Sequence, residues 1–114
     1  MSPEDKNLPK SIQALLLEAD NCTSAGLYEQ AKKCYDKVLS LKPSCKDAWI
    51  GMGVLALQQD QFRSAQGAFR QAIKSDPYCW RAWMGIALLY NLKGDKKNAL
   101  QALERAKNPY LWGC

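Results

Sequence analysis

Histidine does not occur anywhere in this chain of 114 residues. It is the commonest general acid-base group near neutral pH and a frequent metal ligand. The sequence also has no glycine-rich phosphate loop and no pair of carboxylates at a glycine-marked turn. These absences argue against acid-base, nucleophilic and phosphoryl-transfer chemistry. We therefore expect a protein that is not an enzyme and that needs no cofactor.

The cysteines lack the spacing of a metal site. There are five of them, an odd number, with no Cys-x-x-Cys pair and no histidine to complete a ligand set. Cys22 and Cys34 fall on predicted packing faces, where buried thiols are inert. Cys45 and Cys79 occupy equivalent places 34 residues apart. The sequence predicts free thiols and no bound metal.

Long apolar runs are missing as well. The first one, Leu15-Leu16-Leu17, is interrupted at once by Glu18, and residues 1–6 are polar. Nothing resembles the core of a signal peptide, and no stretch approaches the ~18 apolar residues that could span a bilayer. We expect no direct membrane insertion and a cytoplasmic location.

The formal charge is +5, with a pI near 9.0, but the basic residues are not concentrated. They extend from Lys6 to Lys107 and share their segments with acidic residues such as Glu18 and Glu104. A solvated surface explains this spread better than a nucleic-acid-binding stripe. Helical repeats that read bases also need polar residues in equivalent rows, where this chain has Leu16, Ile50 and Met84. We expect no nucleic-acid partner.

One pattern occurs three times at a spacing of 34 residues. The equivalent sets are Ala14, Ala48 and Ala82; Leu15, Trp49 and Trp83; Ala19, Gly53 and Ala87; Ala31, Ala65 and Ala99; Tyr35, Phe69 and Leu103; and Val38, Ala72 and Ala106. Small residues in such rows let two helices cross closely, so Ala19, Gly53 and Ala87 can accept a bulky partner such as Tyr35 or Phe69.

Each copy contains two apolar patterns of helical period, separated by breaks at residues 25–26, 59–60 and 93–94. Gly26 and Gly94 suit the left-handed conformation that ends a helix. Between copies, Pro43 and Pro77 interrupt the helices, and Ser44 and Asp76 are candidate caps for the helices that follow. The predicted helices lie near residues 11–24, 27–41, 45–59, 61–75, 78–93 and 95–107.

The order of these residues resembles the tetratricopeptide repeat family, with Trp49, Met52-Gly53, Ala65, Phe69, Ala72 and Pro77 in the middle copy. The resemblance covers residues 12–107. It implies an all-α fold: a right-handed α-solenoid of three helix-turn-helix units, with six antiparallel helices in one domain over residues 1–114. The expected repeats are 12–45, 46–79 and 80–111, with a short tail at 108–114. Pro109 comes two residues early for the period, so we expect the last helix to end early.

The resemblance also implies that the first helix of each pair lines a concave groove for another protein. The groove positions carried onto this sequence are Gln13, Leu16, Asp20, Thr23, Asp47, Ile50, Val54, Leu57, Arg81, Met84, Leu88 and Asn91. Most central positions are apolar, which favours a hydrophobic peptide or an amphipathic helix as the ligand. Alternatively, some of these residues pack against the neighbouring helix.

Members of the family that clamp the acidic C-terminus of large chaperones use lysine, asparagine and arginine in the groove. Of the corresponding positions here, only Arg81 fits, because the others are Leu16, Asp20, Gly51 and Gly85. A chaperone-tail receptor is therefore disfavoured. The remaining alternatives are a scaffold, a chaperone or assembly factor for a secreted or membrane-complex subunit, and a self-associating fragment of a longer repeat protein.

The C-terminal end needs a cover, because each repeat presents an apolar face to the next. Only seven residues follow Lys107, too few for a full capping helix. Tyr110, Leu111 and Trp112 could fold back over the last helix, a partner or second copy could cover it, or the array could continue. We expect covering by another chain, with these three residues at a C-terminal interface.

Overall fold

The computed structural model describes residues 9–107, and residues 1–8 and 108–114 are not described. The described part contains six helices and no strand. The helices are α2 (Lys10–Ser24), α3 (Tyr28–Leu41), α4 (Lys46–Gln58), α5 (Phe62–Ser75), α6 (Trp80–Leu92) and α7 (Lys96–Lys107). The predicted helices are confirmed within two residues at every end.

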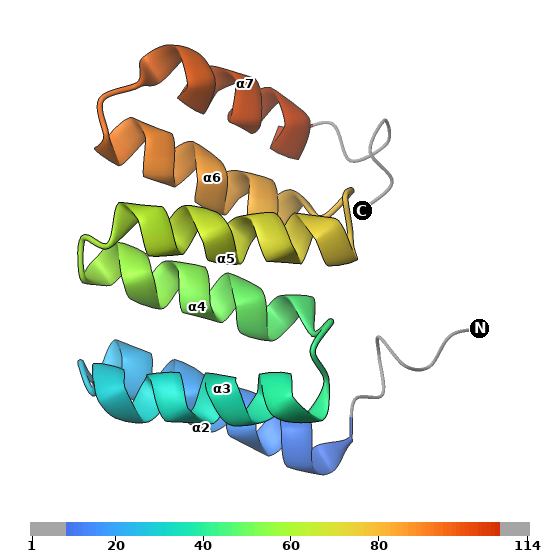
Figure 1. Cartoon of the computed structure of the whole chain (residues 1–114). Coiled ribbons are helices and arrows are strands. Elements are labelled where there is room, and N and C mark those ends of the chain that lie inside the picture. The colour runs from blue at the N-terminus through green and yellow to red at the C-terminus, as the bar shows by residue number, and fades with distance from the viewer. Residues whose placement is uncertain (1–8, 108–114) are drawn as a thin grey trace.

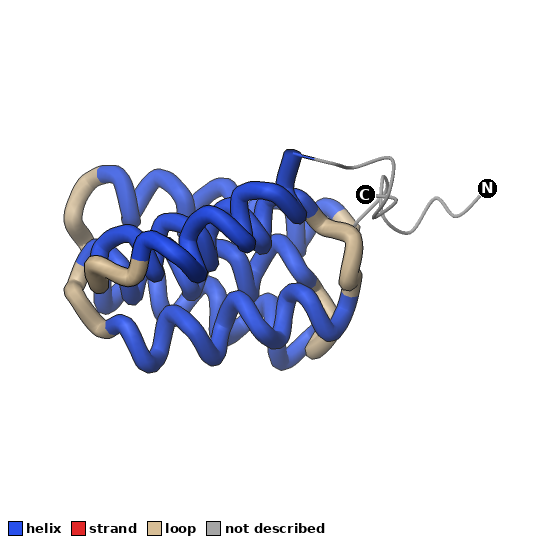
Figure 2. Tube along the Cα trace, turned by 90° about the horizontal axis from the view of Figure 1, so that it is seen from above, coloured by secondary structure: helices blue, strands red, loops and turns tan. Residues whose placement is uncertain are grey.

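The helices form three antiparallel pairs: α2 with α3, α4 with α5, and α6 with α7. Successive pairs stack on one another, so that α2 and α3 lie at one end of the solenoid and α7 lies at the other (Figure 1). Seen from above, the connecting loops gather at the two ends of the helices (Figure 2). The all-α solenoid expected from the repeat pattern is therefore present.

Backbone conformation explains why the breaks within each copy end a helix. Gly26 and Gly94 have φ of 81° and 82°, the left-handed conformation predicted for them. Asp60 occupies the equivalent place in the middle copy with φ of 58°. Aspartate tolerates this region better than most side chains do, so the turn forms there without glycine.

The helix starts between copies differ from the prediction. Neither Ser44 nor Asp76 caps the following helix, because Cys45 and Cys79 occupy the N-cap positions and no cap side chain makes a hydrogen bond. Asp76 instead accepts a hydrogen bond from the Tyr78 backbone N–H at 3.1 Å. It also forms an ion pair with Lys46 Nζ at 2.6 Å. A carboxylate at this place therefore stabilises the turn and ties it to the preceding repeat.

The core is built around the rings of Tyr35 and Phe69, whose exposed fractions are 1% and 0%. Phe69 lies between two helices: a Cβ added at Gly53 would approach its ring to 2.6 Å, and one added at Gly85 would also collide with it. Tyr35 packs against Gly51 in the same way. The predicted fit of Phe69 against Gly53 is confirmed, and each ring also reaches the first helix of the next repeat.

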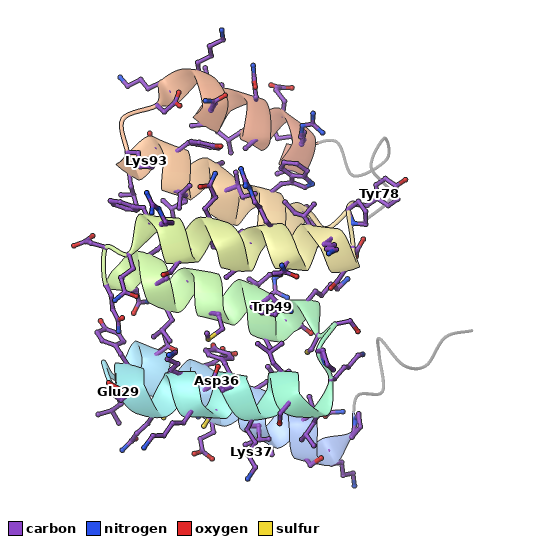
Figure 3. The ribbon with its side chains drawn as sticks, in the orientation of Figure 1. Glu29, Asp36, Lys37, Trp49, Tyr78 and Lys93 are labelled. Carbon is purple, nitrogen blue, oxygen red and sulfur yellow. The ribbon has the colours of Figure 1, made fainter. Side chains whose placement is uncertain are left out.

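Repeat-equivalent hydrogen bonds fix the junctions between copies. The indole Nε1–H of Trp49, on α4 in Figure 3, donates to the Pro43 carbonyl at 2.9 Å. Trp83 makes the same bond to Pro77 at 3.0 Å. The guanidinium of Arg105 lies 4.9 Å from the centre of the Trp83 ring, a favourable cation-π geometry.

The buried residues form two clusters that meet at α4. One joins α2 and α3 to Ala48 and Leu55, and the other joins Ile50, Ala56 and Leu57 to α5, α6 and α7. The second helix pair therefore belongs to both halves of the core.

Candidate functional site

A concave hollow of about 430 Å³ opens between the first helices of the repeats. It is lined by Leu16, Asp20, Thr23, Ser24, Tyr35, Asp47, Ile50, Gly51, Val54, Gln58 and Arg81. All of these residues except Tyr35 belong to α2, α4 or α6. Helical periodicity places residues from successive turns of α2 and of α4 on this face, whereas α6 contributes Arg81 alone to the lining.

Six of the predicted groove residues meet in the concave hollow: Leu16, Asp20, Asp47, Ile50, Val54 and Arg81. Thr23 joins them but is buried, and its hydroxyl donates to the Ala19 carbonyl at 2.8 Å. Ile50 is only 5% exposed, so little of its side chain is available to a ligand, whereas Val54 is 39% exposed.

The other predicted groove residues lie elsewhere. Leu57 is 6% exposed and packs in the core, so it is not a groove residue. Gln13 is exposed but does not line the concave hollow. Met84, Leu88 and Asn91 line a second hollow at the far end of the solenoid. Tyr110, Leu111 and Trp112 lie outside the described residues.

The Asp20 carboxylate in the concave hollow is held by a buried tyrosine. The buried Tyr35 hydroxyl donates a hydrogen bond to Asp20 Oδ1 at 2.6 Å. Burial raises the pKa of Tyr35 above its ordinary value of 10.0, and the Asp20 hydrogen bond and negative charge raise it further. The phenol therefore stays neutral, and the carboxylate is held beside Leu16 and Val54.

The charges of Asp47 and Arg81 pair with each other. Arg81 Nη1 lies 3.0 Å from Asp47 Oδ1, across the junction between α4 and α6. Both side chains are at least one-third exposed, so water screens the pair and it contributes about 0 to 1 kcal/mol. A charged ligand group that approaches Asp47 or Arg81 would therefore have to compete with their ion pair.

The raised pKa of Tyr35 predicts a loss of stability at high pH. Below pH 10 the phenol is neutral in both states, whereas above it the unfolded chain releases a proton that the folded chain retains. The difference in unfolding free energy between the wild type and Tyr35→Phe should therefore shrink as the pH rises above about 10. Urea denaturation at a series of pH values measures this difference. A difference that stays constant through the alkaline range would contradict the assignment.

The end groove is an apolar hollow of about 410 Å³ between α6 and α7. It is lined by Met84, Ala87, Leu88, Asn91, Lys96, Ala99, Leu100 and Leu103. Met84, Leu88 and Leu100 are 42%, 49% and 62% exposed, a high value for clustered aliphatic side chains. The sequence predicted an uncovered face at this end of the solenoid but not which residues form it.

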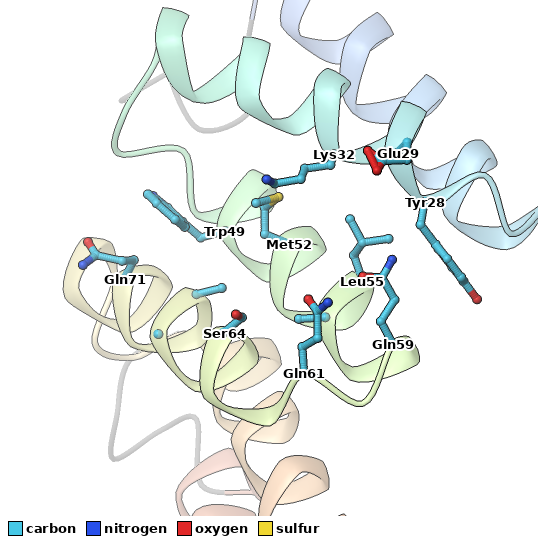
Figure 4. A pocket seen from close by; sticks show the side chains of 13 residues that line it. Tyr28, Glu29, Lys32, Trp49, Met52, Leu55, Gln59, Gln61, Ser64 and Gln71 are labelled. Atoms are coloured by element: carbon cyan, nitrogen blue, oxygen red, sulfur yellow. The ribbon is translucent and has the colours of Figure 1, made fainter.

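A third hollow, of about 650 Å³, lies between α3, α4 and α5 and was missed by the sequence reasoning (Figure 4). Met52, Leu55 and Trp49 form its apolar part, and the amides of Gln59, Gln61 and Gln71 surround them. The sequence feature that could have indicated this hollow is a run of small residues on α5. Gly67 stands where the other copies have Lys33 and Gln101, and a Cβ there would meet open space.

The thiols within residues 9–107 are free and buried. Burial raises the pKa of Cys34, as does its contact with the Glu18 carboxylate at 3.5 Å, so its nucleophilic thiolate is disfavoured. No three histidine, cysteine, aspartate or glutamate side chains of the described chain gather as metal ligands. None of the described helices is both long and apolar enough to cross a membrane.

Comparison with known proteins agrees with this architecture. A tetratricopeptide repeat family model matches residues 50–110, and a second matches residues 12–45. A search of curated proteins finds no match. The repeats of this family are protein-protein interaction modules.

Two solved structures illustrate the likeness. A crystal structure of MamA has a TM-score of 0.77 and 19% identity, over 87% of this chain and 58% of that protein. PilF of Pseudomonas aeruginosa has a TM-score of 0.83 and 23% identity, over 90% of this chain and 46% of PilF. The chain therefore spans about half the length of these proteins, and at such identities the likeness concerns the fold. With a single family model matching more than half of its residues, the chain belongs to the tetratricopeptide repeat family.

Proposed function

We propose that this chain is a protein-binding scaffold whose concave hollow holds a short peptide or one face of a helix from a partner. The main support is that the accessible side chains of Leu16 and Val54 lie in one hollow with the carboxylates of Asp20 and Asp47. Such a surface combines apolar contact with a polar group that fixes orientation.

The charges indicate which peptides fit best. Arg81 is paired with Asp47, which leaves Asp20, among the described residues that line the concave hollow, as the carboxylate without an opposite charge. Its contact with Tyr35 is a hydrogen bond from a neutral phenol, so its negative charge remains. A segment that places an aliphatic residue against Val54 and a lysine or arginine near Asp20 matches both the apolar contact and the negative charge.

Random peptides displayed on phage and selected on the immobilised full chain test this proposal. Selected sequences should combine an aliphatic residue with a basic one. Val54→Asp should weaken their binding at least tenfold, about 1.4 kcal/mol, because it places a charge on the apolar contact. Asp20→Asn keeps an acceptor for Tyr35 but removes the charge, so it should weaken peptides that contain the basic residue. Isothermal titration calorimetry measures both effects.

Leu41→Asp provides the matched control, because Leu41 is 57% exposed at the end of α3 and does not line the concave hollow. It should bind the selected peptides as the wild type does, and circular dichroism should report equal helicity for all variants. Undiminished binding by Val54→Asp, or an equal loss in Leu41→Asp, would refute the proposal.

A further inference from the structure

The first end of the solenoid exposes a helix face that is covered wherever it recurs inside the molecule. On α2 this N-terminal face consists of Ala14, Leu17, Glu18 and Asn21, all exposed. Its equivalents on α4 and α6 contact the preceding repeat. Ala48 and Ala82, for example, are both 0% exposed.

The opposite end shows the complementary pattern. Met84 in the end groove is 42% exposed, whereas its equivalent Ile50 is 5% exposed because α6 follows it. Leu103 is half-buried, whereas its equivalents Tyr35 and Phe69 are almost fully buried against the next first helix. The end groove is therefore the third-repeat equivalent of the surfaces that pack against the next first helix at the two internal junctions.

We propose that the end groove binds a second copy of this chain, head to tail, through the N-terminal face of α2. Side-chain volume supports this occupant. At the internal junctions a large ring meets a glycine: Tyr35 meets Gly51, and Phe69 meets Gly85. At the proposed junction Leu103 meets Leu17, which stands at the position of those glycines. Two leucines together carry as many side-chain non-hydrogen atoms as a tyrosine beside a glycine, so the volume is conserved.

Charge supports the same pairing. Glu18 is equivalent to Met52, which lies with Tyr28, Glu29 and Lys32 of the preceding repeat around one hollow. In the third copy those three positions are Lys96, Lys97 and Leu100. The docked Glu18 would therefore face two lysines and an aliphatic side chain.

A symmetric dimer through two end grooves lacks this complementarity. It would bring Lys96 and Lys97 of both copies together, and like charges at close range oppose association. Head-to-tail contact uses two different surfaces, so each bound copy still offers a free surface at its other end and further copies can add until a ring closes. The inference goes beyond the proposed peptide binding, which uses a different surface.

Light scattering coupled to size-exclusion chromatography, run on the full chain over a wide concentration range, tests the proposal. The mass should rise above that of a monomer with concentration and fall as salt is added, because the lysine-glutamate contacts are screened. Leu17→Glu disrupts the N-terminal face of α2, and Leu100→Glu disrupts the end groove. Each variant should be monomeric. Both residues are exposed, so helicity should not change.

Mixing the two variants gives the decisive measurement. Each retains one intact end, so an equimolar mixture should form dimers and nothing larger. Leu41→Glu, another exposed leucine, should associate like the wild type. A chain lacking residues 108–114 should do so as well.

Three results would overturn the inference. Loss of association in Leu100→Glu but not in Leu17→Glu would indicate a symmetric contact or another occupant. A monomeric full chain that associates only after removal of residues 108–114 would assign the end groove to the tail. A monomer at all concentrations in every variant would exclude a second copy.

Discussion

Replacing Phe69 with alanine is expected to lower the free energy of unfolding by about 3 to 5 kcal/mol. The ring is completely buried and contacts both α4, at Gly53, and α6, at Gly85. The two glycines cannot fill the space that the ring would leave. Domains of this size are stable by about 5 to 15 kcal/mol, so the loss is a large part of the total stability. Urea denaturation followed by circular dichroism measures the loss.

Phe69→Leu is the control for this prediction. Leucine occurs at the equivalent position in the third copy, as Leu103, and it retains much of the buried volume. Its cost should therefore be clearly smaller than that of alanine. Similar losses in the two variants would mean that the ring's volume does not hold the junction together.

Gly53→Leu is expected to cost about 1 to 3 kcal/mol, because the space above Gly53 is already occupied. The first atom of any side chain there would lie 2.6 Å from the Phe69 ring, well inside van der Waals contact. The two helices would have to separate or the ring would have to leave its site. Thermal unfolding should show a lower midpoint, and an unchanged midpoint would contradict the observed packing.

Gly67→Ala separates this steric effect from helix propensity. Gly67 lies within α5, and a Cβ there would contact nothing within 4 Å. Alanine should stabilise the chain by about 0.5 to 1 kcal/mol, because glycine weakens a helix interior. Opposite signs for Gly53→Leu and Gly67→Ala are the expected signature.

Periodicity was sufficient to predict the six helices and their breaks, and the family resemblance implied how the helix pairs stack. The 34-residue repeat places Gly26 and Gly94 at equivalent turns, and proline marks the boundaries between copies. The caps were less predictable. Serine and aspartate are good cap residues in general, but the side chain of Asp76 is already used by Lys46 and the Tyr78 backbone. A local sequence pattern does not show that a residue distant in the sequence will bind the side chain expected to cap the helix.

The site was predicted in part for a related reason. Sequence spacing indicates which residues share a face of one helix, but it does not indicate how deeply a neighbouring repeat covers that face. Leu57 and Val54 both lie on α4, yet only Val54 reaches the concave hollow. The ion pair between Asp47 and Arg81 also depends on the distance between two helices, which the pattern of either helix alone does not determine.

The position of α4 in both core clusters has a consequence for the motions of the chain. The outer helices α2 and α7 each have a neighbouring repeat on one side only, whereas α4 is covered from both sides within the described residues. Repeat stability is a sum of nearest-neighbour terms, so the ends should open and close without the centre. In the monomeric chain, amide protons of α4 should then exchange with solvent only when most of the chain unfolds, whereas those of α7 should exchange through local fraying.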